Sequence, residues 1–105
     1  MSGFAEFNYH NNELFVESVP LKQIADEFGT PCYVYSRSAL TKAYQEFDTS
    51  FANRDHLICY AVKANSNIAI LNLFAQLGSG FDIVSGGELQ RVMKAGGDPQ
   101  KTVFS

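Results

Sequence analysis

The sequence predicts an α/β fold built around a parallel sheet. From Cys32 onward, short apolar runs alternate with segments whose apolar residues recur at the i, i+3, i+4 spacing of an amphipathic helix. Strands that are apolar along their whole length, separated by such helices, are typical of a parallel sheet covered by helices, either open or closed into a barrel. A (β/α)8 barrel takes about 250 residues, so this chain would supply less than half of one.

The expected elements follow one another in a regular order from Cys32. Strands are predicted at residues 32–35, 57–62, 81–84 and 102–104. The helices between them each place apolar side chains on one face: Leu40, Ala43, Tyr44 and Phe47; Ile70, Leu73, Phe74 and Leu77; Leu89, Val92 and Met93. Ser36 is the expected N-cap of the first of these helices. The order strand, helix, strand is therefore repeated to the end of the sequence.

The first 30 residues do not fit this alternation. Residues 13–19 resemble a strand, and Pro20 then opens a helix that Gly29 ends. We expect this segment to belong to another layer or to another domain.

Composition excludes several classes of function. The chain has 105 residues and a net charge of −3, so it offers no basic surface to nucleic acid or to anionic lipid. The N-terminus lacks the basic start and apolar stretch of a signal peptide, which predicts a cytoplasmic protein. Cys32 and Cys59 lie in separate apolar runs and are interpreted as buried, reduced thiols. His10 and His56 have no metal-ligand spacing around them, so no metal site is expected.

Lys63 is the first candidate for chemistry. It follows the apolar run 57–62, at the carboxyl end of a predicted buried strand, which is the edge where ligands bind in α/β sheets. A lysine amine in such a place can form a Schiff base with a carbonyl compound. The alternative is an ordinary solvated residue at a strand terminus.

Asp82 and the turn after it are the next candidates. A carboxylate inside the apolar run 81–84 is costly unless it has a partner, and Asp82 should lie on the strand beside Lys63, where an ion pair between them is possible. Residues 85–88, Ser-Gly-Gly-Glu, spell a capping box. The same turn could present free N–H groups to a phosphate.

The sequence also resembles a known family. Three stretches carry the resemblance, which covers nearly the whole chain in the right order: residues 60–67, Tyr-Ala-Val-Lys-Ala-Asn-Ser-Asn; residues 77–89, from Leu-Gly-Ser-Gly-Phe-Asp to Gly-Gly-Glu-Leu; and residues 103–105, Val-Phe-Ser. Residues 28–35, Phe-Gly-Thr-Pro-Cys-Tyr-Val-Tyr, match as well. The chain looks like the opening part of the bacterial diaminopimelate decarboxylases, which are fold-type III pyridoxal-phosphate enzymes.

The resemblance implies a fold, a cofactor and a site. Residues 1–30 would contribute to a β-rich domain and its connection, and residues 31–105 would form the first βα units of a cofactor-binding (β/α)8 barrel, truncated after about its third strand. Lys63 would hold pyridoxal 5′-phosphate covalently, Asp82 would be the aspartate close to that lysine, and Glu88 a nearby acidic residue of the cofactor site. Residues 85–87 would mainly form a turn and a helix cap, and they would not be the site that binds the phosphate group of the cofactor.

The resemblance further implies that meso-2,6-diaminopimelate is decarboxylated to L-lysine by a homodimer. The present chain would be an N-terminal fragment that is inactive alone, because the residues that stack on the cofactor and bind its phosphate are absent. Three alternatives stay open. The chain could come from an ornithine or arginine decarboxylase or an amino-acid racemase of the same fold, from a non-catalytic relative that carries the cofactor, or from a plain α/β binding module.

Overall fold

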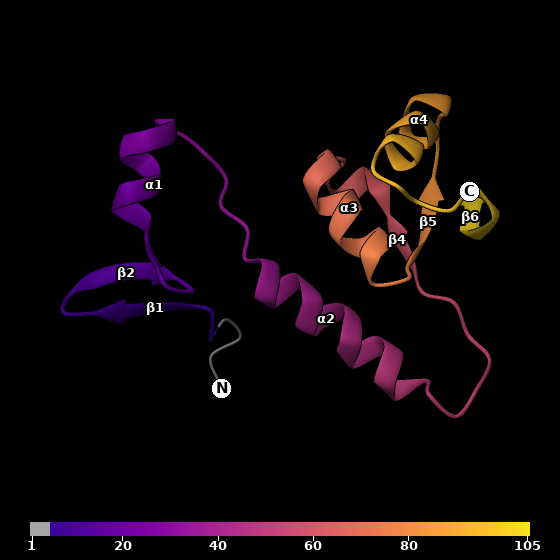
Figure 1. Cartoon of the computed structure of the whole chain (residues 1–105), viewed down its shortest axis with the longest axis horizontal. Helices are drawn as coiled ribbons and strands as arrows, with labels where there is room; N and C mark the ends of the chain where they lie inside the picture. Colours follow the sequence, from indigo (N-terminus) through magenta and orange to yellow (C-terminus); the bar gives the residue numbers. More distant parts are fainter. Residues whose placement is uncertain (1–4) are drawn as a thin grey trace. The chain divides into compact units, whose positions relative to one another are not determined.

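The computed structural model describes residues 5–105, which form two compact units. The first unit ends at Ala43 and the second runs from Tyr44 to Ser105, so the boundary falls within helix α2 (Arg37–Ser50) (Figure 1). Among the described residues, no helix is both long and apolar enough to cross a bilayer.

The first unit contains a small antiparallel sheet. Strands β1 (Phe7–His10), β2 (Glu13–Val16) and β3 (Val19–Pro20) pair in sequence order, and helix α1 (Leu21–Phe28) follows directly. The β1–β2 turn consists of Asn11 and Asn12, both with positive φ, which is the backbone that a two-residue hairpin requires. The predicted strand 13–19 is thus two short strands broken at Glu17, and β1 was not predicted.

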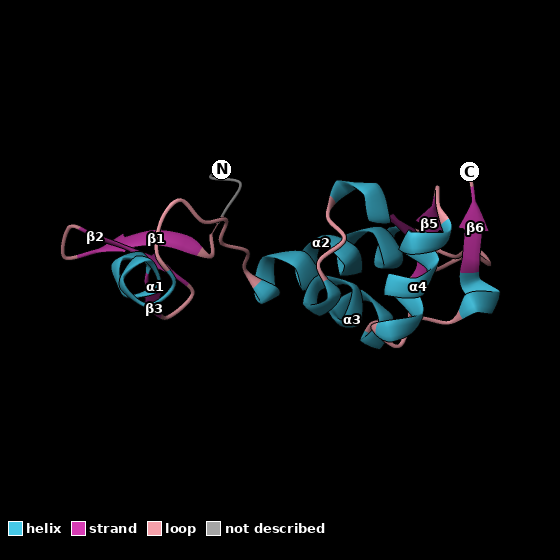
Figure 2. Ribbon diagram, turned by 90° about the horizontal axis from the view of Figure 1, so that it is seen from above, coloured by secondary structure: helices cyan, strands magenta, loops and turns pink. Residues whose placement is uncertain are grey.

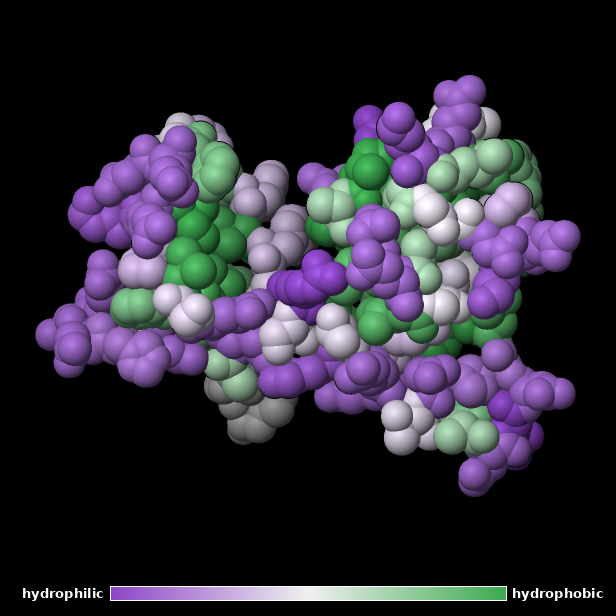
Figure 3. Space-filling model, viewed as in Figure 1, coloured by the Kyte–Doolittle hydropathy of each residue, from purple (hydrophilic) through white to green (hydrophobic). Residues whose placement is uncertain are grey.

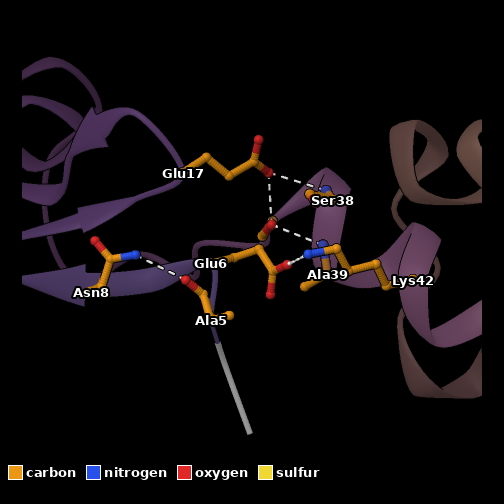
Figure 4. Close-up of polar contacts among 8 residues, drawn as sticks. Ala5, Glu6, Asn8, Glu17, Ser38, Ala39 and Lys42 are labelled. Carbon is orange, nitrogen blue, oxygen red and sulfur yellow. Dashed lines mark hydrogen bonds and ion pairs between the residues drawn. The ribbon is translucent and has the colours of Figure 1, made fainter. Parts of the chain in front are cut away.

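A polar network in the same unit joins this sheet to the start of α2 (Figure 4). Ser36 caps the helix, since its Oγ accepts a bond from the Ala39 N–H at 3.0 Å, and it donates to Glu17 at 2.7 Å. Lys42, one turn further along α2, forms an ion pair with Glu6 at 2.5 Å. The hydrogen bond from Ser36 holds the pKa of Glu17 below its usual range, and Lys42 does the same for the pKa of Glu6.

The prediction of a strand at residues 32–35 was wrong. These residues have no regular secondary structure, and Tyr33 is 92% exposed. An apolar run becomes a strand only where a neighbouring backbone completes its hydrogen bonds, and residues 32–35 pair with neither described sheet. The prediction that both cysteines are buried was also wrong, because Cys32 is exposed and Cys59 is only half-buried.

The second unit is a parallel sheet with helices on one face. Its strands are β4 (Cys59–Ala61), β5 (Gly80–Ile83) and β6 (Thr102–Phe104), in that spatial order, and all neighbours are parallel. Helices α3 (Ile68–Gln76) and α4 (Gly86–Lys94) connect them, with the short 3₁₀ turns η1 (Val62–Ala64) and η2 (Pro99–Lys101). Figure 2 shows β5 and β6 side by side and pointing the same way.

The core of this unit lies between the sheet and its helices. Four large side chains are fully buried there: Val62, Leu71, Phe81 and Val92. Tyr60 stacks on Phe74 of α3 with ring centroids 4.5 Å apart. Apolar groups also remain at the surface, including Phe104, which is 74% exposed, and Figure 3 shows apolar surface in both units.

Gly80 fixes how closely the three strands approach. A Cβ added there would lie 2.4 Å from the Lys101 carbonyl oxygen and 2.8 Å from Cys59 Sγ, so contacts from both neighbouring segments close on this position. Its N–H donates to the Ile58 carbonyl at 2.8 Å. Only glycine fits at this position.

We therefore expect Gly80→Ala to destabilise the protein by about 1–3 kcal/mol, as overpacking of a close-packed interior does. The matched control is Gly86→Ala, where an added Cβ meets nothing within 4 Å. Thermal unfolding followed by circular dichroism should show a lower midpoint for Gly80→Ala and an unchanged or higher one for Gly86→Ala. Equal midpoints for the two variants would contradict the packing argument.

His56 closes the loop between α2 and β4. Its Nδ1 lies 2.8 Å from the Arg54 carbonyl oxygen and its Nε2 lies 2.7 Å from Asp48 Oδ1. Both neighbours are acceptors, so both contacts are hydrogen bonds only when the ring carries two protons. The Arg54 carbonyl and then Asp48 raise the pKa of His56 above its ordinary 6.5, with Asp55 adding to the effect.

A histidine whose pKa is raised by folding stabilises the fold fully below its unfolded pKa and loses this contribution as pH rises through the folded pKa. Asp48→Asn should therefore lower the free energy of unfolding more at pH 6 than at pH 8.5. Urea unfolding of both proteins at the two pH values measures this. A larger effect at pH 8.5 would show that the ring is not a cation in the folded protein.

Candidate active site

Lys63 lies where the first strand of the parallel sheet ends. It is the middle residue of η1, directly after β4, and its side chain is exposed. The preceding residue, Val62, is completely buried, which anchors the turn in the core. The sequence prediction placed Lys63 at the carboxyl end of a buried strand, and the structure confirms its position after the strand. The strand itself is shorter than predicted and only half-buried, and the lysine lies in a 3₁₀ turn.

The residues around Lys63 hold the backbone of this turn. The Tyr60 hydroxyl donates to the Asn65 carbonyl at 2.9 Å. Asn65 Oδ1 accepts from the Asn67 N–H at 3.0 Å, and Asn67 Oδ1 in turn caps α3 by accepting from the Ala69 N–H at 2.8 Å. From α4, Arg91 donates to the Ser66 carbonyl at 3.1 Å. Lys63 thus lies between the buried Val62 and a following segment whose backbone is held by side-chain hydrogen bonds.

Asp82 lies on the neighbouring strand, on the sheet face opposite to the helices. Its register partner in β4 is Ala61, two residues before Lys63, and its partner in β6 is Val103. Side chains alternate along a strand, so Asp82 points away from the face that carries the buried Phe81 and Ile83. Cys59 shares the Asp82 face, and burial, followed by the charge of Asp82, raises the pKa of its thiol.

The partner of Asp82 is a hydroxyl group and not the predicted lysine. Ser105 Oγ donates to Asp82 Oδ1 at 2.6 Å. Across residues 5–105, the ion pairs do not include one between Lys63 and Asp82. Both residues lie toward the carboxyl edge of the sheet, but they are held separately. Sequence reasoning included Ser105 in one of the stretches that resemble the family, but it did not predict that its hydroxyl is the partner of Asp82.

Glu88 and Ser85 form the helix cap that the sequence predicted. Ser85 Oγ accepts from the Glu88 N–H at 3.1 Å, and Glu88 Oε1 accepts from the Val84 N–H at 2.8 Å. Their side chains are therefore used within the turn that follows β5. A role for Glu88 in cofactor binding stays a prediction. No group of three potential metal ligands occurs among the residues that the structure describes.

The site that results is an exposed amine in the turn after β4 and a hydroxyl-bound carboxylate on the adjacent parallel strand β5. Residues 37–105 match the family described as pyridoxal-dependent decarboxylase, pyridoxal binding domain. This match covers most of the chain and the whole of the parallel sheet. The chain belongs to this family of pyridoxal-dependent decarboxylases.

Individual relatives within the family are close in sequence. The chain is 59% identical over 99 residues to the diaminopimelate decarboxylase of Haemophilus influenzae, a match that covers 94% of this chain and 24% of the relative. It is 62% identical over 92 residues to the diaminopimelate decarboxylase of Neisseria meningitidis serogroup A, covering 88% and 23%. The chain thus spans about a quarter of the length of these relatives.

A solved structure shows the same fold. The diaminopimelate decarboxylase of M. jannaschii, determined in co-complex with L-lysine, superposes with a TM-score of 0.92 at 33% identity. The superposition covers 99% of this chain and 25% of that one. The mixed α/β fold therefore resembles the N-terminal region of these decarboxylases.

Proposed function

We propose that these residues are the first part of a pyridoxal-phosphate enzyme that decarboxylates meso-2,6-diaminopimelate to L-lysine. The observation that carries this proposal is the placement of Lys63 at the carboxyl end of β4, beside the strand that bears Asp82. The identity of about 60% to two named diaminopimelate decarboxylases supports the choice of substrate. The named relatives are about four times as long as this chain, so the activity is proposed for the full-length protein.

The residues present fit covalent attachment of the cofactor. Lys63 is exposed, and within the described chain no ion pair holds its ammonium group, so Nζ is available to bond the aldehyde carbon of pyridoxal phosphate with loss of water. The anchored backbone on both sides would keep Nζ at one edge of the sheet. Bound pyridoxal phosphate supplies an electron sink for the electron pair that remains when carbon dioxide leaves an α-carbon.

Two other residues have defined tasks in this proposal. Asp82 places a negative charge on the sheet face without helices, where it favours cationic groups such as the amine of an incoming substrate. Lys63 Nζ, once released, can carry a proton at the carboxyl edge of the sheet. Glu88, held at the start of α4, is proposed as a further acidic group of the same site.

We further propose that β4, β5 and β6 are strands of a (β/α)8 barrel. The sheet is wholly parallel, and its helix-free face carries Val103, which is half-exposed, beside Asp82. Parallel sheets are ordinarily buried on both faces, and closure into a barrel would bury this one. The proposed division into a β-rich domain from residues 1–30 and a barrel from residue 31, the homodimer and the cytoplasmic location stay predictions.

Covalent attachment has a direct test. When the full-length protein is incubated with pyridoxal phosphate, reduced with borohydride and digested, the peptide containing Lys63 should gain the mass of one reduced cofactor. Lys63→Arg should abolish this labelling, whereas the control Lys94→Arg, at the exposed end of α4, should leave it unchanged. An unlabelled Lys63 peptide in a folded sample would overturn both the enzyme and the cofactor-carrier interpretations.

Substrate choice needs a second experiment. The full-length protein should release carbon dioxide from meso-2,6-diaminopimelate and not from ornithine or arginine, and Lys63→Arg should lower the rate by at least about 100-fold, the scale of a lost proton-transferring group. Labelling of Lys63 without release of carbon dioxide would instead indicate a non-catalytic carrier. Preference for ornithine or arginine would assign the chain to another decarboxylase of the same fold.

A further inference from the structure

Ser105 and Asp82 are joined by one of the shortest side-chain hydrogen bonds of the second unit. The Ser105 Oγ to Asp82 Oδ1 distance is 2.6 Å. This length is typical of a hydroxyl that donates to an ionised carboxylate, a bond stronger than one between neutral groups. Asp82 lies on β5, and Ser105 directly follows the neighbouring strand β6.

The backbone holds Ser105 in place for this contact. Its N–H donates to the Ile83 carbonyl at 3.0 Å, which continues the ladder between β5 and β6 by one step. Because Val103 is paired with Asp82, and side chains two residues apart on a strand share a face, Ser105 presents its hydroxyl on the same face as the carboxylate. The contact therefore follows from the register of the sheet.

We propose that Ser105 is a positioning residue for the Asp82 carboxylate, and that it thereby sets how firmly the Lys63 site binds pyridoxal phosphate. This inference rests on the proposed function. An ionised carboxylate only accepts hydrogen bonds, so its orientation depends on the donors that reach it, and among the described hydrogen bonds of Asp82 the donor is the Ser105 hydroxyl. The Ser105 hydroxyl fixes one oxygen, so the second oxygen keeps a constant direction at the carboxyl edge where Lys63 lies.

The test uses three variants of the full-length protein. Ser105→Ala removes the donor, Ser105→Thr keeps a hydroxyl in a residue that suits strands, and Thr102→Val is the matched control. Thr102 lies at the opposite end of β6, and its hydroxyl donates to the Asp98 carbonyl at 3.1 Å, away from Asp82. Each protein is freed of cofactor and titrated with pyridoxal phosphate, and the absorption of the bound cofactor is followed against pH.

Ser105→Ala should bind pyridoxal phosphate about tenfold more weakly, the effect of losing one hydrogen bond to a charged group. It should also shift the pH at which the cofactor absorption changes, which a purely structural role of the hydroxyl would not do. Ser105→Thr should restore both values toward those of the wild type. Thr102→Val should change neither, even where it lowers the thermal midpoint.

Three outcomes would count against the inference. The first is a wild type that binds the cofactor and a Ser105→Ala variant with the same affinity and the same pH profile. This result would overturn the role of Ser105 and leave the proposed function intact. Equal losses in Ser105→Ala and Thr102→Val reduce the role to general stability of β6. A wild type that binds no pyridoxal phosphate at all removes the proposed function itself.

Discussion

The parallel register between β4 and β5, which pairs Ala61 with Asp82, determines where Lys63 and Asp82 lie relative to each other in the second unit. It places the apolar side chains of β5 beneath the helices and Asp82 on the other face. It also brings the turn with Lys63 to the same edge as the end of β5. A slip of one residue would exchange the two faces and bury the carboxylate against α3 and α4.

This register is held by close packing at one end and by side-chain bonds at the other. At the amino end, the Lys101 carbonyl and Cys59 Sγ approach Gly80 so closely that a side chain there would clash with both. At the carboxyl end, Ser105 donates its N–H to Ile83 and its hydroxyl to Asp82. Fully buried Phe81 lies between these ends and fixes the sheet against its helices. The site therefore depends on packing that is local to three short strands.

Much of the second unit could be predicted from the sequence, because its signals are local. Apolar spacing gave the helices α2, α3 and α4, and the Ser85 to Glu88 pattern gave the cap of α4. What failed depends on partners distant in sequence. Residues 32–35 have the composition of a strand and no neighbouring strand, and the hydroxyl partner of Asp82 comes from Ser105, 23 residues later. No local pattern carries such information.

Residues 60–67, which contain Lys63, are all of common types, but the structure gives a reason for most of them. Tyr60, Asn65 and Asn67 all bond to backbone groups, and Val62 fills the core, so the fold itself accounts for these residues. The fold does not account for Lys63, since an exposed position in a 3₁₀ turn accepts most polar residues equally well. This contrast supports the proposal that Lys63 is present for covalent chemistry with the cofactor.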